Sequence, residues 1–355
     1  MFLCFFGLVA IYSVALGQGQ GEFLNFQKQI IWLAVGLAAM FFFSYLDYHL
    51  WRKIGWIGYG ISVFLLALVL TPLGSVVNGA GGWFDFGFLS FQPVELAKIF
   101  TIVVLADVYS RYGRSIHKFI SLLFLSLIVI LPLILTAIQP DFGSAMILFL
   151  TWLTSFFLVT KNKWHFVIII GGLAAILLAS WLFVFQDYQK DRILTFVNPS
   201  LDPLGRGYNV KQSVIAVGAG RILGRGLGFG SQSQLKFIPE SQTDFIFSVI
   251  AEELGLVGII FLLIFFGLIF FRLFRIASRS PDDFGQFITL LVLILLSIQV
   301  FINIGMSIGL LPVTGISLPL VSYGGSFLLV VLALLGIILN IYQSSIVSRK
   351  YQGDI

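Results

Sequence analysis

The strongest constraint on this chain is a series of apolar runs, each close to twenty residues long, that recurs along its whole length. A helix that crosses a bilayer needs about 20 mostly apolar residues. Hydrophobic residues make up 59% of the 355 residues, and charged residues only 10%. A soluble domain cannot cover so much apolar surface, and the runs lack the alternation typical of a membrane β-barrel. The sequence therefore predicts an all-α, polytopic membrane protein.

Ten transmembrane helices are predicted, and we expect them to form one membrane domain over residues 1–355. The first run, Met1 to Leu16, has no basic start and no small-residue cleavage site, so we interpret it as a helix and not as a signal peptide. The single Cys4 excludes an intrachain disulfide. The predicted spans are 1–17, 28–46, 54–71, 93–110, 118–138, 141–160, 164–185, 243–271, 285–311 and 318–346.

Basic residues predict the orientation of the chain. Cytoplasmic loops of membrane proteins are enriched in Lys and Arg. One set of short loops holds only Lys28. We therefore expect both termini in the cytoplasm, on the side of the other loops and the C-terminal tail. That side holds Arg52, Lys53, Arg111, Arg114, Lys118, Lys161, Lys163, Arg272, Arg275, Arg279, Arg349 and Lys350.

The largest predicted non-membrane element is one extracytoplasmic loop over residues 186–242. Loops of this length are usually functional. Its middle, NVKQSVIAVGAG, is mildly apolar and predicts a short interfacial helix. Its basic residues fit either a solvated surface, contact with anionic lipid, or an anionic ligand. They are Lys190, Arg192, Arg206, Lys211, Arg221, Arg225 and Lys236. The glycine-rich run Gly224 to Gly230 lacks the Lys-Ser/Thr of a P-loop, which excludes that kind of nucleotide site.

Asp244 is the candidate catalytic residue. An ionisable side chain at membrane depth costs several kcal/mol and so marks a functional site. At ~100° per residue, Asp244 shares one helix face with small residues, Ser248, Ala251, Gly255 and Gly258. Glu252 is expected about 12 Å deeper, and Glu253 on the opposite face. Asp244 is therefore predicted to lie alone at the opening of its helix.

Several other intramembrane polar residues are candidates for a supporting role. Glu95 and Lys98 can pair on one helix face, which fits structure and function equally well. Asp141 is interpreted as a helix cap. The remaining candidates are expected to form interhelical hydrogen bonds or to lie near the mouth of the site. They are Glu252, Glu253, Gln299, Asn303 and Ser322.

Histidine chemistry is not expected beside Asp244. His49, His117 and His165 all fall in or near predicted cytoplasmic loops. This placement excludes a histidine base or a histidine metal site on the outer side, and it makes a hydrolase triad improbable.

Five motifs, in this order, resemble the SEDS family (shape, elongation, division and sporulation), which includes RodA and FtsW. They are FQPVELAK, QPDFGSA, the loop DRILTFVNPSLDPLGRGYNVKQSVIAVGAGRILGRGLGFGSQ, IPESQTDFIFSVIAEELGLVG, and NIGMSIGLLPVTGISLPLVSYGGS. The resemblance covers nearly the whole chain and is greatest to the RodA branch. One departure is Gly82-Trp83, where the family usually has Arg-Trp.

The resemblance implies a peptidoglycan glycosyltransferase of the bacterial inner membrane, which polymerises lipid II into β-linked glycan strands for cell-wall elongation and cell shape. It implies a growing lipid-linked glycan strand as the second substrate and a class B penicillin-binding protein as partner, with no role for nucleic acid. Asp244 matches the aspartate that the family needs for activity.

Lipid II carries its sugar on a pyrophosphate in the α configuration. A β-linked glycan product therefore indicates one inverting displacement at the sugar. Asp244 would act as the base for the acceptor hydroxyl. Basic residues would stabilise the leaving pyrophosphate, with Arg192, Arg206, Lys211, Arg221 and Arg225 as candidates. A divalent cation, Mg or Mn, is a possible helper, and no organic cofactor is expected.

Two other functions stay open at this point. A lipid II flippase or other transporter would use the same lipid, and broken helices or inverted repeats would favour it. A non-catalytic scaffold for a penicillin-binding protein would leave Asp244 as a helix cap.

Overall fold

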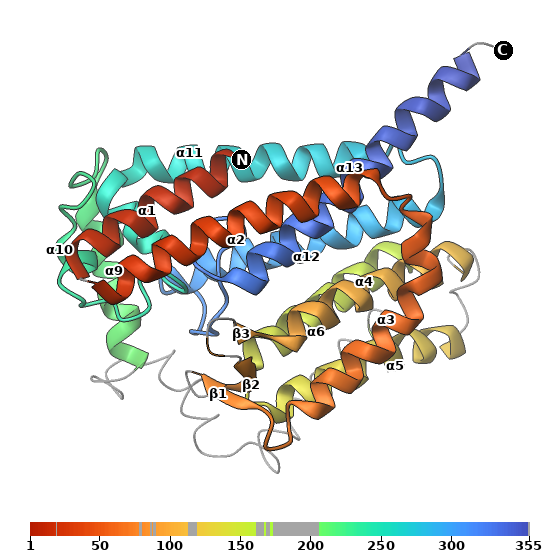
Figure 1. The fold of residues 1–355 in the computed structure, drawn as a ribbon, viewed down its shortest axis with the longest axis horizontal. Helices are drawn as coiled ribbons and strands as arrows, with labels where there is room; N and C mark the ends of the chain where they lie inside the picture. The colour runs from red at the N-terminus through yellow and green to blue at the C-terminus, as the bar shows by residue number, and fades with distance from the viewer. Residues whose placement is uncertain are drawn as a thin grey trace. The chain divides into compact units, whose positions relative to one another are not determined.

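The computed structural model is mostly helical, which confirms the all-α prediction (Figure 1). It describes residues 1–18, 20–77, 80–85, 87, 90–112, 119–160, 167, 171–172 and 206–353. The chain divides into two compact units. The first unit contains residues 1–27, 160–265 and 299–323, and the second contains residues 28–159, 266–298 and 324–355.

The first unit is built around the N-terminal part of α11 (Ile246–Ala277) and the end of α12 (Asp283–Ser307). It also holds α1 (Phe2–Gln18), α9 (Arg206–Gly220) and the short α10 (Ser231–Gln234). The predicted short helix in NVKQSVIAVGAG is confirmed as part of α9. The ring of Phe2 stacks on Phe265 at 5.0 Å, so α1 runs alongside α11.

The second unit holds most of α2 (Gln20–Tyr45), α3 (His49–Leu68), α4 (Pro93–Tyr112), α5 (Phe119–Ile138), α6 (Phe142–Val159) and α13 (Gly325–Gly353). α4 is the central helix, since most of its side chains are buried. Glycines on α3 let it approach α4 closely. A Cβ at Gly58 would collide with the ring of Phe100. Small residues have this role at many membrane helix contacts.

A small antiparallel sheet, which the sequence did not predict, precedes α4. Its strands are β1 (Ser75–Val77), β2 (Ala80–Asp85) and β3 (Ser90–Phe91), in that order. Ser75 lies opposite Trp83, and Phe84 lies opposite Phe91. The backbone N–H of Gly81 donates to the carbonyl of Gln139 at 3.1 Å, which ties the sheet to the connection between α5 and α6.

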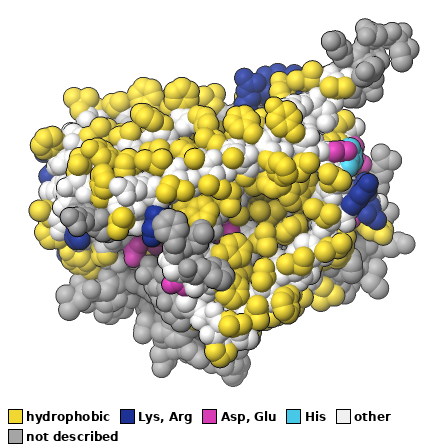
Figure 2. Space-filling model, viewed as in Figure 1, with side chains coloured by type: hydrophobic (Ala, Val, Ile, Leu, Met, Phe, Trp, Pro, Cys, Tyr) yellow, Lys and Arg dark blue, Asp and Glu magenta, His cyan; other side chains and the backbone are white. Residues whose placement is uncertain are grey.

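The predicted spans agree well with the helices. Among the described residues, four helices are long and apolar enough to cross a membrane: Phe23–Tyr45, Ile246–Ala277, Asp283–Ser307 and Gly325–Val347. Three shorter apolar helices match the first, fifth and sixth spans, and α3 and α4 match the third and fourth. The seventh predicted span, 164–185, lies almost wholly outside the described residues. Hydrophobic side chains cover much of the face shown in Figure 2, as expected where lipid is the solvent.

Two predicted boundaries were wrong because helices extend past the apolar core of their spans. α3 begins at His49, so Arg52 and Lys53 lie in its first turns and not in a loop. α11 continues to Ala277, so Arg272 and Arg275 are helical. Long basic side chains tolerate this position because their charged ends can extend to the membrane interface.

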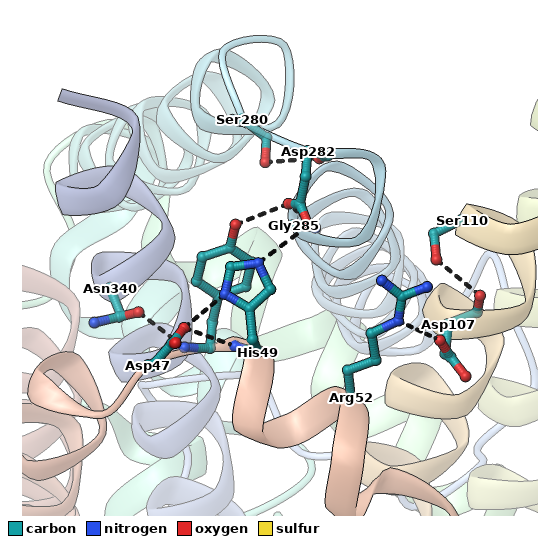
Figure 3. Close-up of polar contacts among 10 residues, drawn as sticks. Asp47, His49, Arg52, Asp107, Ser110, Ser280, Asp282, Gly285 and Asn340 are labelled. Atoms are coloured by element: carbon teal, nitrogen blue, oxygen red, sulfur yellow. Dashed lines mark hydrogen bonds and ion pairs between the residues drawn. The ribbon is translucent and has the colours of Figure 1, made fainter. Parts of the chain in front are cut away.

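Polar contacts join the helix ends on the basic side of the second unit (Figure 3). The hydroxyl of Tyr48 donates to Asp282 at 2.9 Å, and Asp282 also accepts from the backbone N–H of Gly285, which caps α12. The backbone N–H of His49 donates to Asp47 and, with the His49 ring, holds the pKa of that carboxyl below its usual value. Near the C-terminal end of α4, the buried Asp107 accepts a hydrogen bond from Arg52 on α3 at 2.7 Å.

Candidate active site

The turn before α11 presents Asp244 at the opening of that helix, as predicted. The turn is closed by the backbone N–H of Phe245, which donates to the carbonyl of Glu240 at 3.1 Å. The Phe245 side chain is buried in an apolar cluster with Ala216 and Ile238. Burial of the neighbouring ring anchors the turn, while Asp244 itself stays partly exposed.

Asn303 on α12 connects this turn to the chain that follows α12. Its side-chain amide donates to the carbonyl of Asp244 at 2.8 Å and to the carbonyl of Ile316 at 2.7 Å. One amide group therefore holds two backbone segments that are distant in sequence. Polar side chains that bond between helices are the usual device for this inside a membrane protein.

The segment Leu311 to Tyr323 forms a second wall beside the turn. The hydroxyl of Ser322 donates to the carbonyl of Thr243 at 2.6 Å. The backbone N–H of Tyr323 donates to the backbone carbonyl of Gln242 at 2.8 Å. Gly315 lies close to the carboxylate. A Cβ at Gly315 would be 3.6 Å from Oδ2 of Asp244, and its φ of +73° is one that glycine adopts freely. Ser322 therefore lies beside the turn that carries Asp244.

Helix α9 packs against the first turn of α11. Ser213 on α9 shares a hydrogen bond with Ser248 and donates to the carbonyl of Ser307 at 2.6 Å. Of the predicted pyrophosphate ligands, Arg206 begins α9 and Lys211 is exposed on it. These two positions therefore belong to a helix fixed one turn below Asp244. Arg192 lies outside the described residues.

Arg221 and Arg225 lie deeper along α11 than Asp244 does. The backbone N–H of Arg225 donates to the carbonyl of Glu252 at 2.9 Å. Glu252 is eight residues past Asp244, or about 12 Å along a helix. The Arg225 guanidinium also donates to Ser231 at 2.8 Å within its own loop. The structure thus separates these arginines from Arg206 and Lys211.

Glu252 and Glu253 are buried and hold the glycine-rich loop, which agrees with the prediction that they do not cluster with Asp244. Glu252 accepts the backbone N–H groups of Gln232 at 2.9 Å and Ser233 at 3.0 Å. Glu253 accepts from Ser13 on α1 at 2.7 Å, and also from Gln234 and the backbone N–H of Gly228. Both carboxylates therefore have structural partners.

The predicted continuous small-residue face below Asp244 was wrong beyond Ala251. Gly255 has φ 63° and ψ −160°, which breaks the helical path of α11. The next two backbone N–H groups, of Leu256 and Val257, donate to the carbonyls of Arg221 and Ile222 at 2.9 and 3.1 Å. A helix pattern assumes an unbroken helix, and here another segment supplies the missing partners.

Several buried side-chain amides of the first unit have an atom without a hydrogen-bond partner, and Gln242 and Gln299 are two of them. Gln242 is 4% exposed, and neither of its side-chain polar atoms has a partner. Gln299 is 1% exposed, and its oxygen also lacks one. Most buried side-chain polar groups are hydrogen-bonded, so such exceptions mark places where a ligand or water can bind. Sequence reasoning missed Gln242, although it lies two residues before Asp244 in the motif IPESQTDF.

The remaining candidates belong to the second unit. Lys98 donates to Glu95 at 2.7 Å with both side chains buried, which confirms the predicted pair. Asp141 accepts the backbone N–H of Ser144 at 3.0 Å at the start of α6, which confirms the predicted cap. Asp141 also accepts from Gln92 at 3.0 Å.

The last prediction for this site concerns a divalent cation. Among the residues that the structure describes, no group of three or more His, Cys, Asp or Glu side chains is arranged to hold a metal ion. The predicted Mg or Mn ion is untested by this observation and stays a prediction.

The sequence matches a known family over most of its length. A family model described as cell cycle protein, for FtsW, RodA and SpoVE, matches residues 1–346. The chain belongs to this family. The SEDS resemblance inferred from the five motifs is thereby confirmed, and with it the polytopic membrane class.

Curated members of the family share about a third of their residues with this chain. The peptidoglycan glycosyltransferase MrdB of Escherichia coli (strain K12) is 36% identical over 354 residues, which cover 96% of this chain and 92% of that protein. Stage V sporulation protein E of Bacillus subtilis (strain 168) is 37% identical over 353 residues, covering 96% and 93%.

Solved structures of similar proteins share the fold. A chain from a peptidoglycan synthase complex that coordinates polymerization and crosslinking has a TM-score of 0.82 and 32% identity, covering 97% of this chain and 96% of that one. The rod shape determining protein RodA of Thermus thermophilus has a TM-score of 0.72 and 29% identity, covering 97% and 94%.

Proposed function

We propose that this SEDS-family chain is a peptidoglycan glycosyltransferase that polymerises lipid II into β-linked glycan strands, with Asp244 as the general base. The single observation that carries the assignment is the placement of Asp244. It is a partly exposed carboxylate in a turn held from three sides by Asn303, Ser322 and buried Phe245. The relative MrdB, which is named a peptidoglycan glycosyltransferase, and the synthase complex support the reaction class.

The chemistry needs one base and stabilisation of one leaving group. The acceptor sugar hydroxyl must lose a proton as it attacks the anomeric carbon of lipid II, and the pyrophosphate leaves as an anion without a proton. Asp244 accepts the proton of the hydroxyl. A positioned general base contributes about 10²- to 10⁴-fold in rate. Direct attack opposite the α-linked pyrophosphate gives the β-linked product in one inverting step.

Arg206 and Lys211 on α9 are the stronger candidates for stabilising the leaving pyrophosphate. The first turn of α9 carries Arg206 and no acidic residue, although the dipole of a helix favours negative charge there. A bound anion would be stabilised by this helix end. Arg225 already contacts Ser231 within its loop, and we assign it a structural role. Arg192 and Arg221 remain candidates.

The length of α11 supports chemistry at the level of the lipid headgroups. About 20 residues at ~1.5 Å each span the hydrocarbon core. The uncharged apolar run of α11, Leu254 to Phe271, has about this length and begins directly after Glu252 and Glu253. Asp244 then lies roughly 12 Å beyond the hydrocarbon edge. The pyrophosphate of a lipid-linked sugar occupies this layer, with the lipid tail anchored below it.

We also propose the orientation and the protein partner. Asp244 faces the outside and both termini lie in the cytoplasm, as the distribution of basic residues predicts. A class B penicillin-binding protein binds the helices, and the similar chain from a synthase complex that coordinates polymerization with crosslinking supports this partner. Cysteine labelling of intact cells tests the orientation: Ser200→Cys should react with an impermeant reagent and Ser110→Cys should not.

A transporter is the second candidate, because α11 is a broken helix. Broken helices at the binding site are typical of secondary transporters. Here, however, the N–H groups of Leu256 and Val257 after the break are paired with carbonyls of Arg221 and Ile222. These groups are already engaged and cannot bind a transported ligand, so the break favours a loop anchor over a transport site.

The experiment compares Asp244→Asn with wild type in polymerisation of purified lipid II and in lipid II binding. We expect polymerisation to fall about 100- to 10,000-fold while binding and the unfolding temperature hold. Glu253→Gln is the matched carboxylate control and should keep most turnover. Near-normal polymerisation by Asp244→Asn would exclude the general-base role. Lost binding with normal turnover per bound complex would make Asp244 a substrate ligand, as a transporter requires.

A further inference from the structure

The loop 221–237, which connects α9 through α10 to the turn before Asp244, runs alongside α11. Its backbone N–H groups at Arg225 and Gly226 donate to the carbonyls of Glu252 and Glu253, each at 2.9 Å. Glu252 also accepts the N–H groups at the start of α10. Much of the loop's polar backbone is therefore satisfied internally. This is the condition for irregular backbone to enter a membrane interface.

The side chains that this loop leaves exposed are large and apolar. The exposed fractions are 81% for Leu223, 76% for Phe229, 65% for Leu235 and 64% for Ile222. Four large apolar side chains this exposed in one short loop are unusual in water and indicate a membrane or protein contact. It also continues the lipid-facing surface of α11. Ile222 is hydrogen-bonded to Val257, and Val257 is itself exposed on that helix.

Charge in this part of the chain has one sign. The sequence from Pro203 to Pro239 contains no Asp or Glu, and its basic residues are Arg206, Lys211, Arg221, Arg225 and Lys236. The basic residues of the loop itself, Arg221, Arg225 and Lys236, are exposed. Basic and apolar side chains on one surface are the pattern of segments that bind anionic lipid headgroups.

Depth along α11 places the loop at the edge of the hydrocarbon core. The uncharged apolar run of α11 begins at Leu254, directly after Glu252 and Glu253, and extends to Phe271. The loop pairs with α11 at residues 252–257, which is this level. Beside it lies an open depression of about 730 Å³, lined by Ile215 and by residues 218–225. Its apolar and arginine lining suits an acyl chain with an anionic head.

We propose that the loop 221–237 inserts into the lipid leaflet on the Asp244 side, with Ile222, Leu223 and Phe229 among the acyl chains and Arg221 and Lys236 at anionic headgroups. The sequence had indicated that the whole of 186–242 is a loop outside the membrane. The inserted loop instead anchors the connection between α9 and the turn that carries Asp244. This inference concerns the membrane contact and does not depend on the reaction.

Spin-label depth measurements test the insertion. Leu223→Cys and Phe229→Cys variants, labelled with a nitroxide in vesicles of phosphatidylcholine and phosphatidylglycerol, are compared with Phe261→Cys in α11 and Arg279→Cys in the turn after α11. Molecular oxygen concentrates in the acyl region, and a nickel chelate concentrates in water. The collisions of a label with each reagent therefore report its depth. We expect the labels at Leu223 and Phe229 to collide more with oxygen than the label at Arg279 does, and to lie at depths between those of the labels at Arg279 and Phe261.

A nickel accessibility equal to that of the label at Arg279 would overturn the proposal. Protection from both reagents would overturn it too, because protein would then cover the loop.

A charge variant tests the lipid headgroup contact separately. Arg221 and Lys236 have φ of 50° and 60°, a backbone region that Asn tolerates well, so Arg221→Asn with Lys236→Asn keeps the loop conformation. We expect added phosphatidylglycerol to raise the unfolding temperature of wild type and to raise that of the double variant much less. An equal rise in both proteins would refute the headgroup contact. Lys211→Asn, on α9, is the control for a general loss of positive charge.

Discussion

The side-chain amide of Asn303 donates to the backbone carbonyl of Asp244 at 2.8 Å, so a residue on α12 fixes the turn that carries the proposed base. The same amide donates to the carbonyl of Ile316. Replacing it leaves two carbonyls without their donor, and each buried unsatisfied group costs about 1–3 kcal/mol. We expect Asn303→Leu to lower both the unfolding temperature and polymerisation per folded molecule.

The control for Asn303 is Ser307→Ala, which removes only the hydroxyl that donates to the carbonyl of Asn303. That variant should keep the turn and its activity. If Asn303→Leu loses stability but keeps wild-type turnover, Asn303 does not position Asp244.

Glu252 and Glu253 offer a comparison within one pair of adjacent carboxylates. Both oxygens of Glu252 accept backbone N–H groups, whereas Oε2 of Glu253 has no hydrogen-bond partner. A Gln side chain at 253 can turn its NH₂ toward the unpartnered position and keep its oxygen on Ser13. A Gln at 252 must instead point its NH₂ group, a donor, at a backbone N–H that is also a donor.

We therefore expect Glu252→Gln to be the more destabilising of the two substitutions. Hydrogen bonds to charged groups contribute about 1.5–3 kcal/mol. Thermal unfolding in one detergent measures both variants. The opposite order of unfolding temperatures, or equal ones, would contradict the assigned acceptor roles.

Much of the fold could be predicted because span length and apolar composition are local properties of the sequence. Asp244 could be found for the same reason, as an acid at the start of an apolar run. The break at Gly255 could not, since an isolated glycine is tolerated within a helix pattern and only the pairing with Arg221 and Ile222 reveals its conformation. Ser13 and Glu253 are 240 residues apart, and no local pattern links them.

The basic loop shows the same limit. Its residues Arg192, Arg206, Lys211, Arg221 and Arg225 were predicted as candidate pyrophosphate ligands from their charge and from the family resemblance. The structure places Arg225 beside Glu252 and Arg221 beside Leu256, and it puts Arg206 and Lys211 on α9. Charge is visible in a sequence, but the height of each residue along a neighbouring helix depends on tertiary packing.

Gln242 is expected to bind a polar group of the substrate. Its amide is buried without a partner, so it contributes little to the stability of the fold. Removing an unsatisfied buried amide is neutral or stabilising. We expect Gln242→Leu to keep the unfolding temperature at or above that of wild type and to lower polymerisation about tenfold.

The matched control for Gln242 is Gln299→Leu, which removes another buried amide whose oxygen has no hydrogen-bond partner. Titration of lipid II distinguishes weaker binding from slower turnover in the Gln242 variant. Unchanged kinetics in Gln242→Leu would show that a water molecule, and not the substrate, satisfies this amide.

Gly315 gives the sharpest test of how closely the chain after α12 surrounds Asp244. Its φ of +73° is costly for other residues, and a Cβ there would lie 3.6 Å from Oδ2 of Asp244. Gly315→Ala should therefore lose about 1 kcal/mol from backbone strain. It should also bring a methyl group against the carboxylate, where the acceptor hydroxyl must approach.

Gly87→Ala is the matched control, because Gly87 has φ +80° and a Cβ added there would meet nothing within 4 Å. Both variants should show similar destabilisation, and only Gly315→Ala should lower turnover in polymerisation assays at saturating lipid II. If the two variants retain the same activity, the segment around Gly315 does not border the reacting groups.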